Sequence, residues 1–302
     1  MPPLSENFQR AVVEMNMYVA ALALGAAACF GLALVLTQVG LRHLSPMRGA
    51  SISVPCAALL FLALAPALFD TAGFKPQSAL LFALCGCLFP AVVTLLTFEA
   101  NRRVGPAITG ALGNLSPLFA IAMALLVLGE TPQWGQLAGI SVILAGVLLI
   151  IGAPQAIPRQ AFGGAISLLL LAAFVRGLVQ PVVKLGLEGW PSPYSATLIG
   201  YVMSALVLLG FVAVREGNLG ATFSRTGWPW FVPVGLLNGM AVLLMYAALA
   251  SGPVAIVAPL VACYPLATLF FGRVLLGAGG VTRIAGFGVA VTVAGVALLL
   301  GA

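Results

Sequence analysis

Charged residues are scarce in this sequence. Only 7% of the 302 residues are Asp, Glu, Lys or Arg, whereas 62% are hydrophobic and the mean hydropathy is +1.16. This composition excludes a soluble globular protein and is typical of a multi-pass protein of the cell membrane. Ten helical spans of about 20 residues would consume about 200 residues and leave only loops and tails. Any function must therefore be carried out by the membrane-embedded helices, and no nucleic-acid partner is expected.

Lysine and histidine are rarer still, with Lys75, Lys184 and His43 as the full set. Neither lysine follows a glycine, so the phosphate-binding loop of ATP-driven pumps is absent. No GxSxG or HExxH motif occurs, and we expect neither an enzyme activity nor a cofactor or metal. The cysteines lie in apolar runs without metal-ligand spacing and are interpreted as small core residues: Cys29, Cys56, Cys85, Cys87 and Cys263.

Carboxylates are missing from the middle of the apolar segments. All seven lie in tails, loops or last helical turns. A proton antiporter of the small multidrug type would be expected to carry one in mid-membrane, because its titration there couples charge to conformation. Glu99 comes nearest, but Arg102 and Arg103 follow it, and this favours an interfacial ion pair.

Ten apolar segments follow one another along the chain, separated by breaks that contain proline, such as Ser45-Pro46, Lys75-Pro76 and Thr131-Pro132. Hydropathy predicts transmembrane helices near 17–39, 47–69, 77–100, 105–128, 133–151, 163–186, 194–214, 228–250, 253–276 and 282–300. Residues 1–16 form a polar N-terminal tail without the basic start and short apolar core of a cleaved signal peptide.

The second half of the chain repeats landmarks of the first half in the same order. The pairs are Gly105-Pro106 with Gly252-Pro253, Pro117 with Pro265, Gly129 with Gly277, Gly139 with Gly286, and Ala145-Gly146-Val147 with Ala294-Gly295-Val296. The segment Leu36-Thr37-Gln38-Val39-Gly40-Leu41 is likewise echoed by Val182-Val183-Lys184-Leu185-Gly186-Leu187. Apolar segments also resemble one another by chance, but landmarks that keep nearly one offset favour a duplication.

Each repeat, residues 17–152 and 153–302, holds five predicted spans. Because five is odd, the second repeat must cross the membrane in the opposite sense to the first. The predicted fold is therefore an all-α integral membrane protein with ten transmembrane helices in two inverted five-helix repeats. Many secondary transporters are built from inverted repeats around a site near the bilayer midplane.

These landmarks resemble the drug/metabolite transporter superfamily, specifically its EamA-type permeases with two five-helix repeats. The resemblance covers essentially the whole chain and is carried by Gly105-Pro106, Asn114-Leu115-Ser116-Pro117, Leu128-Gly129-Glu130 and Ala145-Gly146-Val147, with Gly252-Pro253, Tyr264-Pro265, Leu276-Gly277 and Ala294-Gly295-Val296 in the second copy. It implies transport of small molecules such as amino acids, drugs or nucleotide sugars. In the first copy Gly129 is followed by Glu130, whereas in the second copy Gly277 is followed by Ala278. The second copy therefore has no carboxylate that could duplicate a role of Glu130.

Polar residues inside the predicted spans are the candidate substrate-binding residues, because a polar group in a membrane usually faces a cavity or another helix. Arg176, Gln180 and Lys184 recur at i, i+4 and i+8, on one face of a helix. Arg176 either recognises an anionic group or pairs with backbone carbonyls, and Lys184 either takes part or extends to the surface. The other candidates are Gln38, Asn114, Ser116, Asn238, Tyr246 and Tyr264. Prolines expected to interrupt helices at depth, and so to act as hinges, are Pro90, Pro117, Pro181 and Pro265, and an interruption is also expected at Pro259.

The fifth and tenth helices carry small residues at Gly135-x-x-x-Gly139 and Gly286-x-x-x-Ala290-x-x-x-Ala294 and few polar ones. We expect them to pack at the periphery, in a monomer or at the contact of a homodimer. The predicted function is a secondary transporter that exports small amino-acid-like or amphipathic metabolites by alternating access around a central cavity. The alternative is a membrane-embedded enzyme or scaffold that acts on lipid-linked substrates, and the missing acid, base and nucleophile sets count against it.

Overall fold

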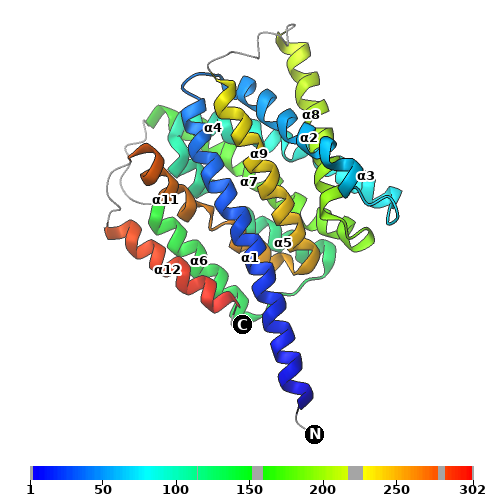
Figure 1. The fold of residues 1–302 in the computed structure, drawn as a ribbon. Helices are drawn as coiled ribbons and strands as arrows, with labels where there is room; N and C mark the ends of the chain where they lie inside the picture. Colours follow the sequence, from blue (N-terminus) through cyan, green and yellow to red (C-terminus); the bar gives the residue numbers. More distant parts are fainter. Residues whose placement is uncertain (1–2, 114, 152–158, 217–226, 278–282, 301–302) are drawn as a thin grey trace.

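The computed structural model describes residues 3–113, 115–151, 159–216, 227–277 and 283–300, and within these ranges it contains helices and no strands (Figure 1). The helices are α1 (Pro3–Gly40), α2 (Pro46–Leu68), α3 (Pro76–Leu88), α4 (Ala91–Gly113), α5 (Ser116–Leu128), α6 (Trp134–Ile151), α7 (Arg159–Gly189), α8 (Pro193–Glu216), α9 (Trp228–Ser251), α10 (Val254–Val261), α11 (Tyr264–Leu276) and α12 (Arg283–Leu300).

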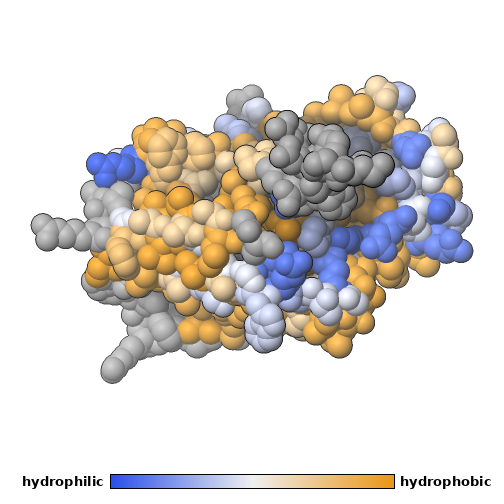
Figure 2. Space-filling model, turned by 90° about the horizontal axis from the view of Figure 1, so that it is seen from below, coloured by the Kyte–Doolittle hydropathy of each residue, from blue (hydrophilic) through white to orange (hydrophobic). Residues whose placement is uncertain are grey.

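Seven stretches of these helices are long and apolar enough to cross a membrane: Met15–Gly40, Pro46–Leu68, Pro76–Gly105, Gly164–Gly189, Pro193–Val214, Trp228–Ser251 and Val254–Leu276. Three shorter apolar helices lie within the remaining predicted spans: Ser116–Leu128 in the second half of 105–128, Trp134–Leu149 in 133–151 and Gly286–Leu300 in 282–300. Large apolar side chains face outward, including Leu126, Leu206 and Phe287. Seen from below, hydrophilic residues gather toward one side and hydrophobic residues cover much of the rest (Figure 2). The predicted class of all-α, multi-pass membrane protein is confirmed.

Helix α1 begins well before its apolar stretch. Residues 3–14 continue the same helix through the part of the chain expected to be a polar tail, and this end projects from the bundle (Figure 1). The stretch apolar enough to cross a membrane begins only at Met15. The start of the helix and the start of its apolar stretch therefore differ in the first repeat.

Contacts between helices come in matched pairs, as a duplication requires. Helix α1 packs on α11 as α7 packs on α5, and α1 packs on α9 as α7 packs on α4. A Cβ atom added at Gly31 would lie 2.5 Å from Ala267 Cβ, and one at Gly177 would lie 2.5 Å from Phe119 Cβ. Gly31 and Gly177 are equivalent in the register of the two repeats, so the same close helix crossing occurs twice.

The glycines that end α5 and α11 also match. Gly129 has φ +68° and Gly277 has φ +59°, and both are left-handed caps that a residue with a Cβ adopts only with strain. The landmark Gly105 differs from its counterpart, because it has φ +77° whereas Gly252 is extended with φ −150°. The chain therefore turns at Gly105 within α4, which joins the third predicted span to the fourth.

Three of the five prolines expected to interrupt helices lie at breaks. The predicted helix 77–100 is divided at Phe89-Pro90, between α3 and α4. Pro117 and Pro265 lie in the first turns of α5 and α11, after breaks that follow Gly113 and Val261. The prediction was wrong for Pro181 and Pro259, since α7 and α10 run through them without a break. A proline frees only one carbonyl, which neighbouring groups can satisfy.

Helices α6 and α12 pack against each other at one side of the bundle (Figure 1). A Cβ atom added at Gly146 would lie 2.5 Å from the backbone nitrogen of Thr292, and one at Gly295 would lie 2.6 Å from that of Ile143. Small residues therefore let the two backbones approach closely. Ala290 and Ala294 face outward instead. The homodimer contact stays a prediction, which the mass of the purified protein in detergent would test.

Candidate functional site

A cavity of about 50 Å³ lies between helices of both repeats. This is room for about three or four water molecules. Its lining residues come from α1, α4, α7, α8, α9 and α11, together with the break between α3 and α4. They are Phe30, Leu34, Thr37, Phe89, Pro90, Val93, Thr94, Thr97, Phe98, Thr109, Arg176, Tyr201, Asn238, Val242 and Tyr264.

Helix breaks and glycines bring these residues together. Phe89 and Pro90 reach the cavity because α3 stops at Leu88 and α4 starts at Ala91. Tyr264 begins α11 after the break that follows α10. A Cβ atom added at Gly113 would lie 2.3 Å from the Tyr264 hydroxyl, so this glycine leaves the space that the tyrosine occupies. Backbone irregularity at membrane depth is found where it lines a cavity, as here.

Arg176 supplies the cationic group of the cavity wall. Its guanidinium carbon lies 5.6 Å from the ring centroid of Phe30 and 5.9 Å from that of Phe89, within the range of cation–π attraction. The guanidinium also donates a hydrogen bond to the Tyr264 hydroxyl. Its Nε atom is buried and has no hydrogen-bond partner among the described residues. None of the ion pairs found in the described part of the chain involves Arg176.

Two further polar groups of the wall are also buried without a partner in the described structure, the Thr109 hydroxyl and the Tyr201 hydroxyl. The Tyr201 ring is held in place by Phe61, with 5.5 Å between ring centroids. A buried polar group without a partner costs roughly 1–3 kcal/mol. With Arg176, three residues of the lining therefore carry a buried polar atom that has no partner in the described structure.

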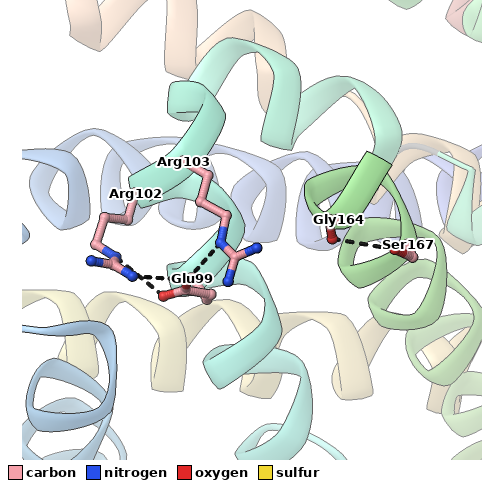
Figure 3. Close-up of polar contacts among 5 residues, drawn as sticks. All are labelled: Glu99, Arg102, Arg103, Gly164 and Ser167. Carbon is pink, nitrogen blue, oxygen red and sulfur yellow. Dashed lines mark hydrogen bonds and ion pairs between the residues drawn. The ribbon is translucent and has the colours of Figure 1, made fainter. Parts of the chain in front are cut away.

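Ion pairs lie near the two ends of the bundle. At one end Glu99 accepts hydrogen bonds from Arg102 at 2.9 Å and from Arg103 at 2.6 Å, all within α4 (Figure 3). The ion pair expected from the sequence is therefore present, and its place at the membrane interface stays a prediction. At the other end Lys184 pairs with Glu130 at 2.7 Å, a contact between α7 and the residue after the cap of α5.

The geometry describes a membrane protein with a small cavity between two inverted repeats, lined by apolar side chains and a few polar ones, and the family comparison agrees with it. Residues 17–152 and 163–301 each match the EamA-like transporter family. The chain belongs to this family. It is therefore a membrane transporter of the drug/metabolite type, as the resemblance of the landmarks predicted.

A solved structure titled "Crystal structure of protein" is similar to this EamA-like transporter, with a TM-score of 0.72 and 16% sequence identity. The match covers 93% of this chain and 97% of that chain. At this identity the likeness shows the fold alone. The comparison with curated proteins finds no match.

Of the candidate residues predicted for this EamA-like transporter, Arg176, Asn238, Tyr264 and Pro90 line the cavity. Gln180 lies one turn from Arg176, is 2% exposed and donates to the Arg176 carbonyl at 3.5 Å, while its own carbonyl oxygen has no partner in the described residues. A contact of any of these with substrate stays a prediction.

Other candidates lie outside the lining. Ser116 is buried at the crossing of α5 with α7, where its carbonyl faces Gly177. Tyr246 is 2% exposed in the core, and Gln38 is half-buried on α1. Lys184 shares a helix face with Arg176 but pairs with Glu130 instead of reaching the cavity. Asn114 lies outside the described residues.

The sequence reasoning missed Tyr201 and a set of threonines, Thr37, Thr94, Thr97 and Thr109. A usable signal was the spacing of Thr94 and Thr97 at i and i+3, which places both on one helix face. Threonines inside helices are ambiguous because their hydroxyls can bond the carbonyl four residues back, as Thr37 bonds Ala33 at 2.7 Å. Such a threonine needs no cavity to be satisfied.

Proposed function

We propose that this EamA-like transporter exports small amino-acid-like or amphipathic metabolites by alternating access around the cavity at Arg176. The observation that carries the proposal is Arg176, which lines the cavity and whose buried Nε atom has no hydrogen-bond partner in the described structure. An arginine in mid-membrane costs at least about 2.5 kcal/mol to insert, and a substrate that returns part of this cost gives the residue a function.

A carboxylate suits this position. The planar guanidinium recognises a carboxylate at two points, and charge-assisted hydrogen bonds are stronger than neutral ones. Phe30, Phe89 and Phe98 give the same cavity apolar walls, while Asn238 and Thr109 add groups that donate and accept hydrogen bonds. A small molecule with a carboxylate, an apolar part and a second polar group therefore fits the chemistry of the lining.

The cavity is too small for such a substrate as it stands, so binding requires the lining helices to move apart. The inverted repeats supply a mechanism, because exchanging the conformations of the two repeats opens the site to the opposite side. This step is the alternating access in the proposal.

The test measures uptake of radiolabelled amino acids, and of the matching amino-acid amides, into liposomes containing the purified protein. We expect Arg176→Gln to fold and to lower transport of the carboxylates by about ten-fold or more, from the loss of a charge-assisted bond worth about 1.5–3 kcal/mol. Arg176→Lys should retain part of the rate. The amides, which lack the carboxylate, should lose less. Arg42→Gln, which removes the same charge from an exposed loop, is the control.

Wild-type transport by Arg176→Gln would show that the arginine does not recognise the substrate. Failure of that variant to reach the membrane, with normal insertion of Arg42→Gln, would make Arg176 a structural residue. The same liposomes address the enzyme alternative, since a transporter leaves the solute unchanged and an enzyme leaves a new product. Among the described residues, no group of three or more His, Cys, Asp or Glu side chains is placed to hold a metal.

A further inference from the structure

Glu130 and Lys184 form a contact that joins the two repeats at one end of the bundle. One oxygen of Glu130 lies 2.7 Å from Lys184 Nζ, and the other accepts the backbone N–H of Val254 at 2.9 Å. Lys184 Nζ also donates to the Gly252 carbonyl at 2.8 Å. A single carboxylate thus holds both the cation of α7 and the first N–H of α10.

The segments held together belong to different repeats. Glu130 follows Gly129, the left-handed cap of α5 in the first repeat, whereas Lys184 and the Gly252–Val254 turn belong to the second. The Glu130 and Lys184 side chains are 18% and 15% exposed, so salt screens the pair less than it would a pair at an open surface.

The cavity lies on the other side of Arg176 from this pair. Lys184 is eight residues beyond Arg176, about 12 Å along the axis of α7. On α1, which runs in the opposite sense, the lining residues Phe30, Leu34 and Thr37 proceed from the level of Arg176 toward the Gly40 end. Neither Glu130 nor Lys184 is among the lining residues. The pair therefore lies between the level of Arg176 and its own end of the bundle, on the side of Arg176 away from the cavity.

The equivalent positions at the opposite end carry neither charge. In the register of the repeats, Gln38 corresponds to Lys184 and Ala278 corresponds to Glu130. The turn that corresponds to Gly252-Pro253 is Gly105-Pro106, whose glycine has a different backbone conformation. The only carboxylate near that turn, among the described residues, is Glu99, and its bonds stay within α4 (Figure 3).

We propose that the Glu130–Lys184 pair is a latch that holds the cavity closed at the Gly252 end and must break for the cavity to open there. This proposal rests on the alternating access proposed above. No ion pair between the repeats is found at the Gly105 end in the part of the chain that the structure describes, so the two ends are closed by unlike contacts. Loss of the latch shifts the population toward the conformation that is open at the Gly252 end.

The experiment compares amide hydrogen exchange of the wild-type protein with that of Glu130→Gln and Lys184→Gln. The glutamine at 130 keeps an oxygen for the Val254 N–H and removes only the charge, and the glutamine at 184 copies residue 38. We expect exchange to rise in residues 129–134 and 252–258. The rise should be about five-fold or more, because five-fold is the lower end of the usual coupling between two sites. Exchange should fall in residues 97–109 at the other end, because opening one end closes the other.

Glu99→Gln is the control, because it breaks a carboxylate ion pair that joins residues of one helix, although this pair is more exposed, with the Arg103 and Glu99 side chains 43% and 23% exposed. It should leave exchange at the Gly252 end unchanged. If a single variant yields too little folded protein, the same measurement is made on the double variant Glu130→Gln with Lys184→Gln. This double variant leaves no unpaired charge.

A rise confined to residues 129–134 and 252–258, without the fall at 97–109, would overturn the latch and make the pair a fold contact. Unchanged exchange in every variant would overturn it as well. The measurement needs no substrate, so its failure is distinct from a failure of the transport proposal. Reciprocal exchange in a protein that moves no amino acid would support the latch and reject the proposed substrate class.

Discussion

Arg176 and Phe30 occupy equivalent positions of the two repeats, and yet they lie against each other, with 5.6 Å from the guanidinium carbon to the ring centroid. Such a contact between equivalent residues places both close to the pseudo-symmetry axis. Because one of them is a cation and the other an aromatic ring, the cavity that they line is chemically one-sided. A ligand with one anionic end therefore has a preferred orientation in it.

A second contact between the repeats lies in the connecting loops. Asp70, after α2, accepts the Trp190 indole N–H at 2.8 Å and the Gly73 backbone N–H at 2.9 Å. These hydrogen bonds lower the pKa of the Asp70 carboxyl below its ordinary value, and the bond from Gly73 contributes most. A lowered pKa means that the charged form stabilises the fold above about pH 4, the ordinary pKa, and that this stabilisation is lost as pH falls through the lower folded value.

We expect Asp70→Asn to lower the melting temperature at pH 7, and the difference from wild type to shrink as pH falls below about 4. Thermal unfolding of the detergent-solubilised protein measures this. Trp190→Phe removes one donor and should show part of the same effect. A difference between Asp70→Asn and wild type that stays constant from pH 7 to pH 3 would contradict the role of the charge.

At the scale of elements, broken helices distinguish this fold from a simple bundle. The breaks before Ser116 and Tyr264 are equivalent in the two repeats, and each is followed by a proline in the first helical turn. The break at Phe89-Pro90 has no counterpart, since α9 runs without interruption through Asn238. The paired breaks are therefore the elements that both conformations of an inverted-repeat transporter would share.

Replacing Pro117 and Pro265 by alanine should slow transport more than it weakens substrate binding, because the helices could then extend through the breaks about which we propose that the halves swing. Initial rates and equilibrium binding of the same amino acid measure the two effects. Pro66→Ala, at an exposed position inside α2, is the control. Equal loss of expression in both hinge variants would show that these prolines serve folding only.

At the scale of the whole molecule, the predicted spans divide the basic residues unevenly between the two sides of the membrane. With ten spans, the side reached after α1 carries Arg42, Arg48, Arg102, Arg103, Arg159, Arg215, Arg225, Arg273 and Arg283, whereas the other side carries Arg10, Lys75 and Lys184. Cytoplasmic loops are enriched in Lys and Arg. This distribution predicts that the loop after α1 is cytoplasmic and that both termini are external, although the family resemblance implies internal termini.

Reporter fusions at Ala302 test this orientation. We expect a reporter that is active only outside the cytoplasm to function there, and one active only inside to stay silent. The orientation would place the Glu130–Lys184 latch at the external end and the cavity nearer the cytoplasm, where an exporter takes up its substrate. An active cytoplasmic reporter at Ala302 would refute the orientation and reverse that assignment.

The sequence by itself determined that the protein lies in a membrane, that it has ten apolar segments and that these segments are duplicated. These follow from properties that are local or periodic: hydropathy over about 20 residues, proline and glycine at helix ends, and landmarks at one offset. An odd number of spans in each repeat then requires inversion. The left-handed caps at Gly129 and Gly277 and the close approaches at Gly31 and Gly177 confirm the register in three dimensions.

Only the tertiary structure decided which polar residues meet. The spacing of Arg176, Gln180 and Lys184 places them on one helix face, yet Arg176 reaches the cavity and Lys184 pairs with Glu130, 54 residues earlier in the chain. Helical periodicity gives the direction of a side chain from its own axis, whereas its partner depends on how neighbouring helices cross and where they break. For this reason Tyr201 and the Glu130–Lys184 contact could not be predicted from spacing, and the spacing of Thr94 and Thr97 gave only a shared helix face and not the cavity that this face lines.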